Sequence, residues 1–133
     1  MDRKHVVISG YYGFSNAGDE AVLSAIISEL QNARPNEIDI TVLSASPEDT
    51  ASTYGVAAAP RMSRKDVDKA IDDCDMLISG GGSLLQDVTS IRSLLYYLWI
   101  INKALKKHKK VMILGQELAH SNMAYHDGWY QKS

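Results

Sequence analysis

The chain has little of several residue types, and each shortage excludes a class of protein. Cys74 is the only cysteine among 133 residues, so no internal disulfide can form. The formal net charge is −2, which gives no electrostatic reason to expect a nucleic acid as partner. The longest apolar run, from Leu94 to Ile101, is far shorter than the roughly 20 residues that cross a bilayer. Residues 1–5 hold no apolar segment of a signal peptide, and we therefore expect a cytoplasmic domain.

The sequence signatures of several common sites are also missing. Neither glycine-rich segment contains G-x-G-x-x-G, and Ser44 and Ala45 stand where a dinucleotide site would place an acid. There is no Gly-Lys-Ser/Thr of a P-loop and no Gly-x-Ser-x-Gly elbow. No His, Cys and Asp cluster has metal-ligand spacing. We therefore expect no nucleotide cofactor and no metal.

Two glycine-rich turns dominate what is present. The first runs from Gly10 to Glu20, and the second from Gly80 to Asp87. Each follows a short strand-forming run, 6–9 or 76–79, and leads into an apolar pattern of helical period. Such a strand, turn and helix is where α/β proteins bind anionic or sugar-like ligands, so the sequence predicts a small-molecule site.

The alternation of strand and helix patterns predicts an α/β fold, a Rossmann-like, doubly wound parallel sheet. We expect strands at 6–9, 38–43, 56–59, 76–79 and 110–114. Helices are expected at 19–32, at 47–54 behind a Ser46 cap, after the capping box at 63–66, and at 90–107. In a sheet of order 3-2-1-4-5, the first and fourth strands are neighbours, so the two glycine turns would form one crevice.

The side chains in the turns suit a carbohydrate. Hydrogen-bonding groups come from Asn16, Ser83, Gln86, Asp87 and Thr89, and aromatic surfaces from Tyr12 and Phe14. Asp19, Glu20 and Asp87 are candidate general bases. The alternative is structural: Asp19 and Glu20 complement a helix N-terminus, Asp87 caps a helix, and Phe14 packs. The three consecutive glycines, 80–82, favour a close approach to the backbone.

A second candidate surface lies on the helix at 90–107. Its aromatic residues, Tyr96, Tyr97 and Trp99, precede five lysines between 103 and 110. This pattern fits either a face that meets a membrane or a core helix with lysines near its C-terminus, and the core helix is favoured.

At the two turns the chain resembles the polysaccharide pyruvyl transferases, specifically the CsaB type. The resemblance rests on Ile8–Ala21 and on Leu77–Ser90, which continues through Arg92–Tyr97; shorter matches are Thr41–Ala45 and Tyr54–Val56. It extends from about Val6 to Gln116. It implies two Rossmann-like domains in a GT-B-like arrangement, of which residues 1–116 would be the first.

The resemblance implies transfer of a pyruvyl group from phosphoenolpyruvate, a co-substrate, to an amino sugar. In CsaB-type members the acceptor is an N-acetylmannosamine unit of a lipid-linked cell-wall polymer that anchors surface-layer proteins. A lipid-linked acceptor implies peripheral contact with the inner face of the membrane. The acceptor-binding residues would be Tyr12, Phe14, Asn16, Gly80, Gly81, Gly82, Ser83 and Gln86, with Asp87 or Asp19 as the catalytic acid–base group.

The chain departs from the family pattern after Gln116. Residues 117–133 do not align with the family pattern, so we expect a frameshifted or truncated end and the absence of the second domain. Basic residues for phosphoenolpyruvate are scarce near the turns, and Arg92 is the nearest in sequence. We therefore expect this chain alone to be inactive. Two alternatives stay open: a non-catalytic domain that binds a sugar or phosphate, and half of a nucleotide-sugar glycosyltransferase.

Overall fold

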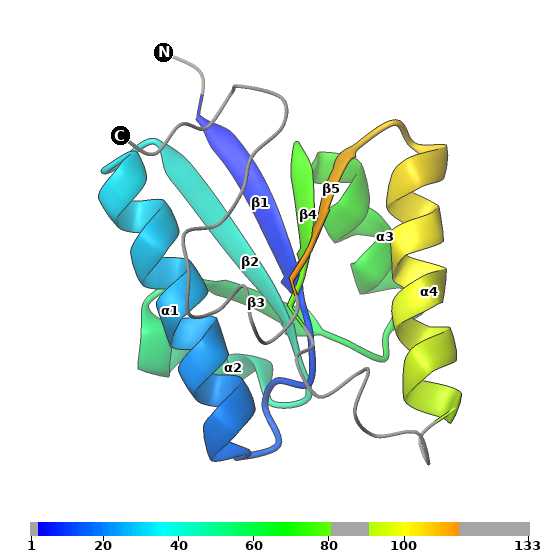
Figure 1. The fold of residues 1–133 in the computed structure, drawn as a ribbon, viewed down its shortest axis with the longest axis horizontal. Helices are drawn as coiled ribbons and strands as arrows, with labels where there is room; N and C mark the ends of the chain where they lie inside the picture. The colour runs from blue at the N-terminus through cyan, green and yellow to red at the C-terminus, as the bar shows by residue number, and fades with distance from the viewer. Residues whose placement is uncertain (1–2, 81–90, 115–133) are drawn as a thin grey trace.

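The structure of the protein is a computed structural model that describes residues 3–80 and 91–114. Strands and helices alternate along these residues (Figure 1). In chain order they are β1 (Lys4–Ser9), α1 (Ala17–Ala33), β2 (Ile38–Ser44), α2 (Pro47–Tyr54), β3 (Ala57–Pro60), α3 (Arg64–Asp73), β4 (Met76–Ser79), α4 (Ile91–Lys106) and β5 (Lys110–Ile113).

The strands form one parallel sheet of order β3-β2-β1-β4-β5. The predicted α/β fold, its doubly wound sheet and the strand order are confirmed. Strand β1 lies in the middle, with Val7 opposite Thr41 of β2 and Leu77 of β4. The chain therefore winds in opposite directions from β1, which is the arrangement that opens a crevice at the carboxyl ends of the strands.

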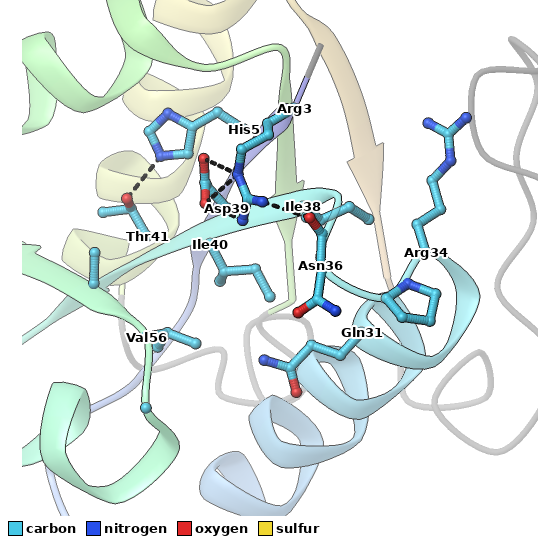
Figure 2. Close-up of a pocket in the computed structure, with 13 residues that line it drawn as sticks. Arg3, His5, Gln31, Arg34, Asn36, Ile38, Asp39, Ile40, Thr41 and Val56 are labelled. Atoms are coloured by element: carbon cyan, nitrogen blue, oxygen red, sulfur yellow. Dashed lines mark hydrogen bonds and ion pairs between the residues drawn. The ribbon is translucent and has the colours of Figure 1, made fainter. Parts of the chain in front are cut away.

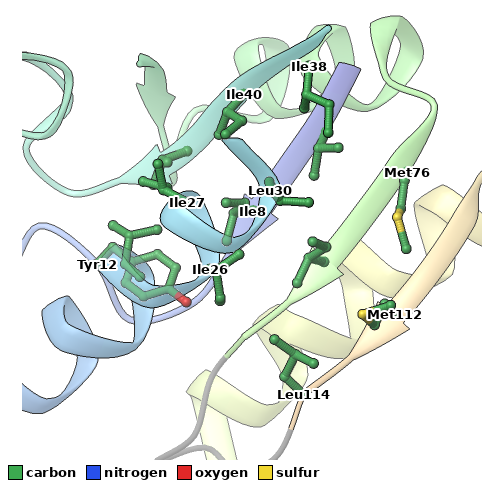
Figure 3. Close-up of a cluster of buried hydrophobic side chains, with 14 residues drawn as sticks. Ile8, Tyr12, Ile26, Ile27, Leu30, Ile38, Ile40, Met76, Met112 and Leu114 are labelled. Carbon is green, nitrogen blue, oxygen red and sulfur yellow. The ribbon is translucent and has the colours of Figure 1, made fainter. Parts of the chain in front are cut away.

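Helices cover both faces of the sheet. Side chains of successive strand residues point to opposite faces, so each strand contributes to two separate clusters. On one face Val6 and Ile8 of β1 pack with α1 residues such as Leu23 and Leu30 (Figure 3). On the other, Val7 packs with residues of α3 and α4, including Ile71 and Ile100. Helix α4 is thus the core helix that the sequence favoured, although its opposite side is exposed.

One helix start and one helix cap differ from expectation, although α2 begins at Pro47 as predicted. Helix α1 begins at Ala17, ahead of the predicted Asp19, because the Asn16 side chain accepts a hydrogen bond from the Asp19 N–H at 3.1 Å. Ser46 does stand before α2, but its hydroxyl makes no capping bond. It instead donates to the carbonyl of Gly13 at 2.9 Å, so it ties the first glycine turn to α2.

No helix within residues 3–80 and 91–114 has both the length and the apolar content needed to span a bilayer.

Candidate functional site at the carboxyl edge of the sheet

The first glycine turn and the start of the second meet at the carboxyl ends of β1 and β4. Ser9 and Ser79 end these strands side by side, and the Gly80 N–H donates to the Ser9 carbonyl at 2.8 Å. Figure 1 shows that α1 and α4 also begin at this edge. The predicted neighbourhood of the turns is therefore confirmed as far as Gly80. The expected site residues Gly81, Gly82, Ser83, Gln86 and Asp87 lie outside the described residues.

Tyr12, expected on the acceptor surface, lies in the core instead. Its side chain is fully buried beside Ile26 (Figure 3), and its hydroxyl donates to the Gly80 carbonyl at 3.3 Å. Burial raises the pKa of the Tyr12 hydroxyl far above its usual value, so the group is a neutral donor. The ring therefore supports both turns from beneath.

The first turn is held by hydrogen bonds to its own helix and to the segment after β2. The Gly13 N–H donates to a Glu20 carboxylate oxygen at 3.0 Å, and the Ala45 N–H donates to the Tyr12 carbonyl at 3.0 Å. Gly13 has a φ of +89° and Ser15 a φ of +61°, values that are rare for residues with a side chain. Strain of this kind is retained at positions that the surrounding structure fixes.

A pocket of about 320 Å³ lies beside this turn, between the first turn of α1 and one side of α2. Its wall is rich in hydroxyl and carboxylate groups; it consists of Gly13, Ser15, Glu20, Ser46, Asp49, Thr50, Thr53 and Tyr54. The Tyr54 hydroxyl donates to Glu20 at 2.6 Å, and burial, reinforced by this bond, raises the pKa of Tyr54 to about 12. Such a wall offers the hydrogen-bonding groups that sugar hydroxyls require.

The two polar candidates in the first turn have different surroundings. Asn16 is exposed, and its side chain caps α1. Asp19 is buried in the first helical turn, and its charge contributes to raising the pKa values of Tyr12 and Tyr97.

Arg61 is the main residue that the sequence analysis missed. It directly follows β3 and is 8 % exposed, although arginine is seldom buried. Its guanidinium lies 5.1 Å from the Phe14 ring centre and 4.4 Å from that of Tyr96. Arg92, the nearest basic residue in sequence, is exposed, whereas the end of β3 brings Arg61 against the first turn.

The aromatic residues around Arg61 come from the first turn and from α4. Tyr11 stacks on Phe14 with ring centres 4.0 Å apart. The Tyr97 hydroxyl accepts a hydrogen bond from Nη2 of Arg61 at 3.1 Å, and the Tyr96 hydroxyl donates to the Arg61 carbonyl at 2.5 Å. Aromatic faces stabilise a cation, so the cluster explains how a charged side chain is held in a largely dry place.

A larger hollow, of about 810 Å³, lies at the opposite edge of the sheet (Figure 2). Its polar groups are engaged with one another: Arg3 pairs with Asp39 at 2.6 Å, and the His5 ring contacts the Thr41 hydroxyl at 2.7 Å. The amino ends of parallel strands are not where ligands of such folds bind. We therefore place the candidate site at the carboxyl edge.

One of three comparisons with known proteins identifies a family for this chain. No curated protein and no solved structure matches the chain at a significant level. The family model described as polysaccharide pyruvyl transferase matches residues 16–122. This match begins after Tyr12 and Phe14, and it continues past Gln116, where the resemblance was expected to end. It covers most of the chain, and the chain therefore belongs to the polysaccharide pyruvyl transferase family.

Proposed function

We propose that this chain is the acceptor-binding half of a CsaB-type enzyme. That enzyme would transfer pyruvyl from phosphoenolpyruvate to an N-acetylmannosamine unit of a lipid-linked cell-wall polymer precursor. The observation that carries the proposal is the family match, together with the meeting of the first glycine turn and Gly80 at one edge of the sheet. The hydroxyl-lined pocket beside Gly13 supports a sugar as ligand.

The reaction joins two acceptor hydroxyls to one carbon. After phosphoenolpyruvate is protonated at its methylene carbon, an acceptor hydroxyl attacks the enol carbon. The bond between this carbon and the phosphate oxygen then breaks, and phosphate leaves with the electron pair. A second acceptor hydroxyl attacks the same carbon and closes the ketal. One hydroxyl proton balances the methyl group that forms, and the other leaves with phosphate. Asp19 or Asp87 would orient the attacking hydroxyl, and Phe14, Asn16 and the glycines 80–82 would form the acceptor wall.

The first test measures acceptor binding to this chain by calorimetry. We expect binding of a disaccharide that contains N-acetylmannosamine on a short prenyl diphosphate, with no release of phosphate from phosphoenolpyruvate. Acceptor-dependent phosphate release should emerge when the same turns are placed in a two-domain member of the family. If that protein releases no phosphate in response to the acceptor, the transferase proposal fails.

The competing functions predict other results in the same experiment. Binding of the sugar without phosphate release in the two-domain protein would favour a non-catalytic binding domain. Binding of a nucleotide sugar, without phosphoenolpyruvate, would favour a glycosyltransferase half. Failure to bind any sugar counts against both the transferase and the binding domain.

We also infer that α4 meets the membrane that carries the acceptor, at its inner face. The helix exposes large apolar side chains on the side away from the sheet; they are Ile91, Leu94, Leu95, Leu98 and Leu105. Exposed Arg92 and Lys106 complement anionic lipid head groups. Because α4 begins at the carboxyl edge of the sheet, this surface would bring the site next to a lipid-linked sugar (Figure 1).

Flotation with vesicles checks this inference. We expect the chain to float with vesicles that contain phosphatidylglycerol, and the double variant L95E/L98E to lose about tenfold or more of that binding. The matched control is Met62→Glu, because Met62 is 76 % exposed and lies outside α4. Equal flotation of L95E/L98E and the wild-type chain would refute the membrane contact.

A further inference from the structure

Arg61 leaves one strong hydrogen-bond donor unused. Its Nε–H is buried and has no hydrogen-bond partner. No acidic side chain within residues 3–80 and 91–114 forms an ion pair with it. A buried charge normally has an ionic partner, and a buried donor without an acceptor destabilises the fold. The aromatic rings offset part of this cost, but they supply no negative charge.

Tyr97 places a second donor beside the first. Its hydroxyl oxygen accepts from Nη2 of Arg61, so its own proton remains to be donated, and no acceptor for that proton is found in the described part of the chain. Burial raises the pKa of Tyr97 to about 12, and the hydroxyl therefore keeps its proton at neutral pH. A guanidinium N–H and a phenol O–H side by side form a fork suited to one oxyanion.

We propose that Arg61 and Tyr97 bind a phosphate or carboxylate group of a substrate. This inference rests on the proposed function, which offers two sources of such a group: phosphoenolpyruvate and the diphosphate of the lipid-linked acceptor. The position of Arg61 fits this proposal, because its guanidinium lies 5.1 Å from the ring centre of Phe14 in the first glycine turn. Phe14 is 41 % exposed, and an anion would reach the Arg61 guanidinium only if this ring turned aside.

The proposal changes what the first domain contributes. The family resemblance implies that most basic residues for phosphoenolpyruvate belong to the second domain. With Arg61 in the crevice, the first domain supplies a cation of its own. A guanidinium held by Tyr97 and by ring faces is preorganised, so little conformational entropy is lost when the anion binds.

Calorimetry on the whole chain tests the proposal with three probes. Phosphoenolpyruvate, inorganic phosphate and farnesyl diphosphate separate the two sources of the oxyanion. We expect Arg61→Gln to weaken binding of the preferred probe about ten- to hundredfold, and Tyr97→Phe to weaken it less. The control is Arg64→Gln, because Arg64 is exposed, has the same charge and also lies near an aromatic ring, that of Trp99.

A second readout reports on the donor itself. In a ¹H–¹⁵N spectrum the Nε–H signal of Arg61, identified by its absence in Arg61→Lys, should shift on addition of the preferred probe. Where Arg61→Gln does not fold, Tyr97→Phe and this shift carry the test. Failure of all three probes to bind, or unchanged binding by a folded Arg61→Gln, overturns the proposal. Sugar binding is measured separately, so a failure of the proposed function is recognised by loss of the sugar response alone.

Discussion

Replacing Gly13 with alanine is expected to lower the free energy of unfolding by about 2–5 kcal/mol. The φ of +89° is unfavourable for any residue with a Cβ. A Cβ would also lie 2.3 Å from the Ser44 hydroxyl and 2.6 Å from the backbone nitrogens of Ala45 and Ser46. Backbone atoms cannot rotate away as a side-chain end can, so the turn must move. Urea unfolding followed by far-UV circular dichroism measures the change.

Gly55→Ala separates the two parts of this effect. Gly55 also has a positive φ, +66°, but no atom lies within 4 Å of the position of its Cβ. Its replacement should cost about 1–2 kcal/mol, the conformational part alone. A Gly13→Ala protein no less stable than Gly55→Ala would mean that the turn does not pack against Ser44–Ser46 as described. Because Gly13 also lines the hydroxyl-rich pocket, a folded Gly13→Ala protein should bind the acceptor more weakly.

Most of the fold could be predicted because local patterns and sheet topology agree in this chain. The continuous apolar run at 6–8 predicts a strand buried on both faces, and β1 is the central strand. Ser63 before α3 predicts a cap, and its hydroxyl accepts from the Asp66 N–H at 3.3 Å. Gly55 predicts a helix end, and it stands there in the left-handed conformation. The strand order then places the two turns together.

The site was harder to predict because its parts are distant in sequence. Arg61 follows a weak edge strand, and nothing local marks it as buried; its surroundings come from the first turn and from α4. One signal was available: an arginine immediately after a strand of a parallel sheet lies at the carboxyl edge, where ligands bind. Tyr12 was predicted to face the acceptor but lies in the core. An aromatic residue in a glycine turn can face either a ligand or the core, and the sequence does not distinguish the two.

Gly80 lies against Tyr12, and its replacement is the second change for which we expect a large loss of stability. A Cβ there would lie 2.6 Å from the Tyr12 hydroxyl and 3.0 Å from Cδ1 of Ile26. Gly80→Ala should therefore cost about 1–3 kcal/mol, the usual cost of overpacking. Tyr12→Phe removes the hydroxyl and leaves the nearest ring atom at 3.9 Å, an ordinary contact. By itself Tyr12→Phe should cost about 1 kcal/mol, because the Gly80 carbonyl loses its donor.

A double-mutant cycle between these two positions decides why Gly80 is glycine. The double variant should lose about 1–2 kcal/mol less unfolding free energy than the two single losses add up to. The reason is that Tyr12→Phe makes the room that the alanine side chain needs. A parallel cycle of Gly80→Ala with Ile26→Val should show little coupling, because Cδ1 of Ile26 is the free end of a side chain and can move. Acceptor binding is then measured on the same proteins. If Tyr12→Phe restores both stability and binding to Gly80→Ala, this glycine serves the packing of Tyr12. If stability returns and binding does not, the backbone at Gly80 must itself approach the sugar.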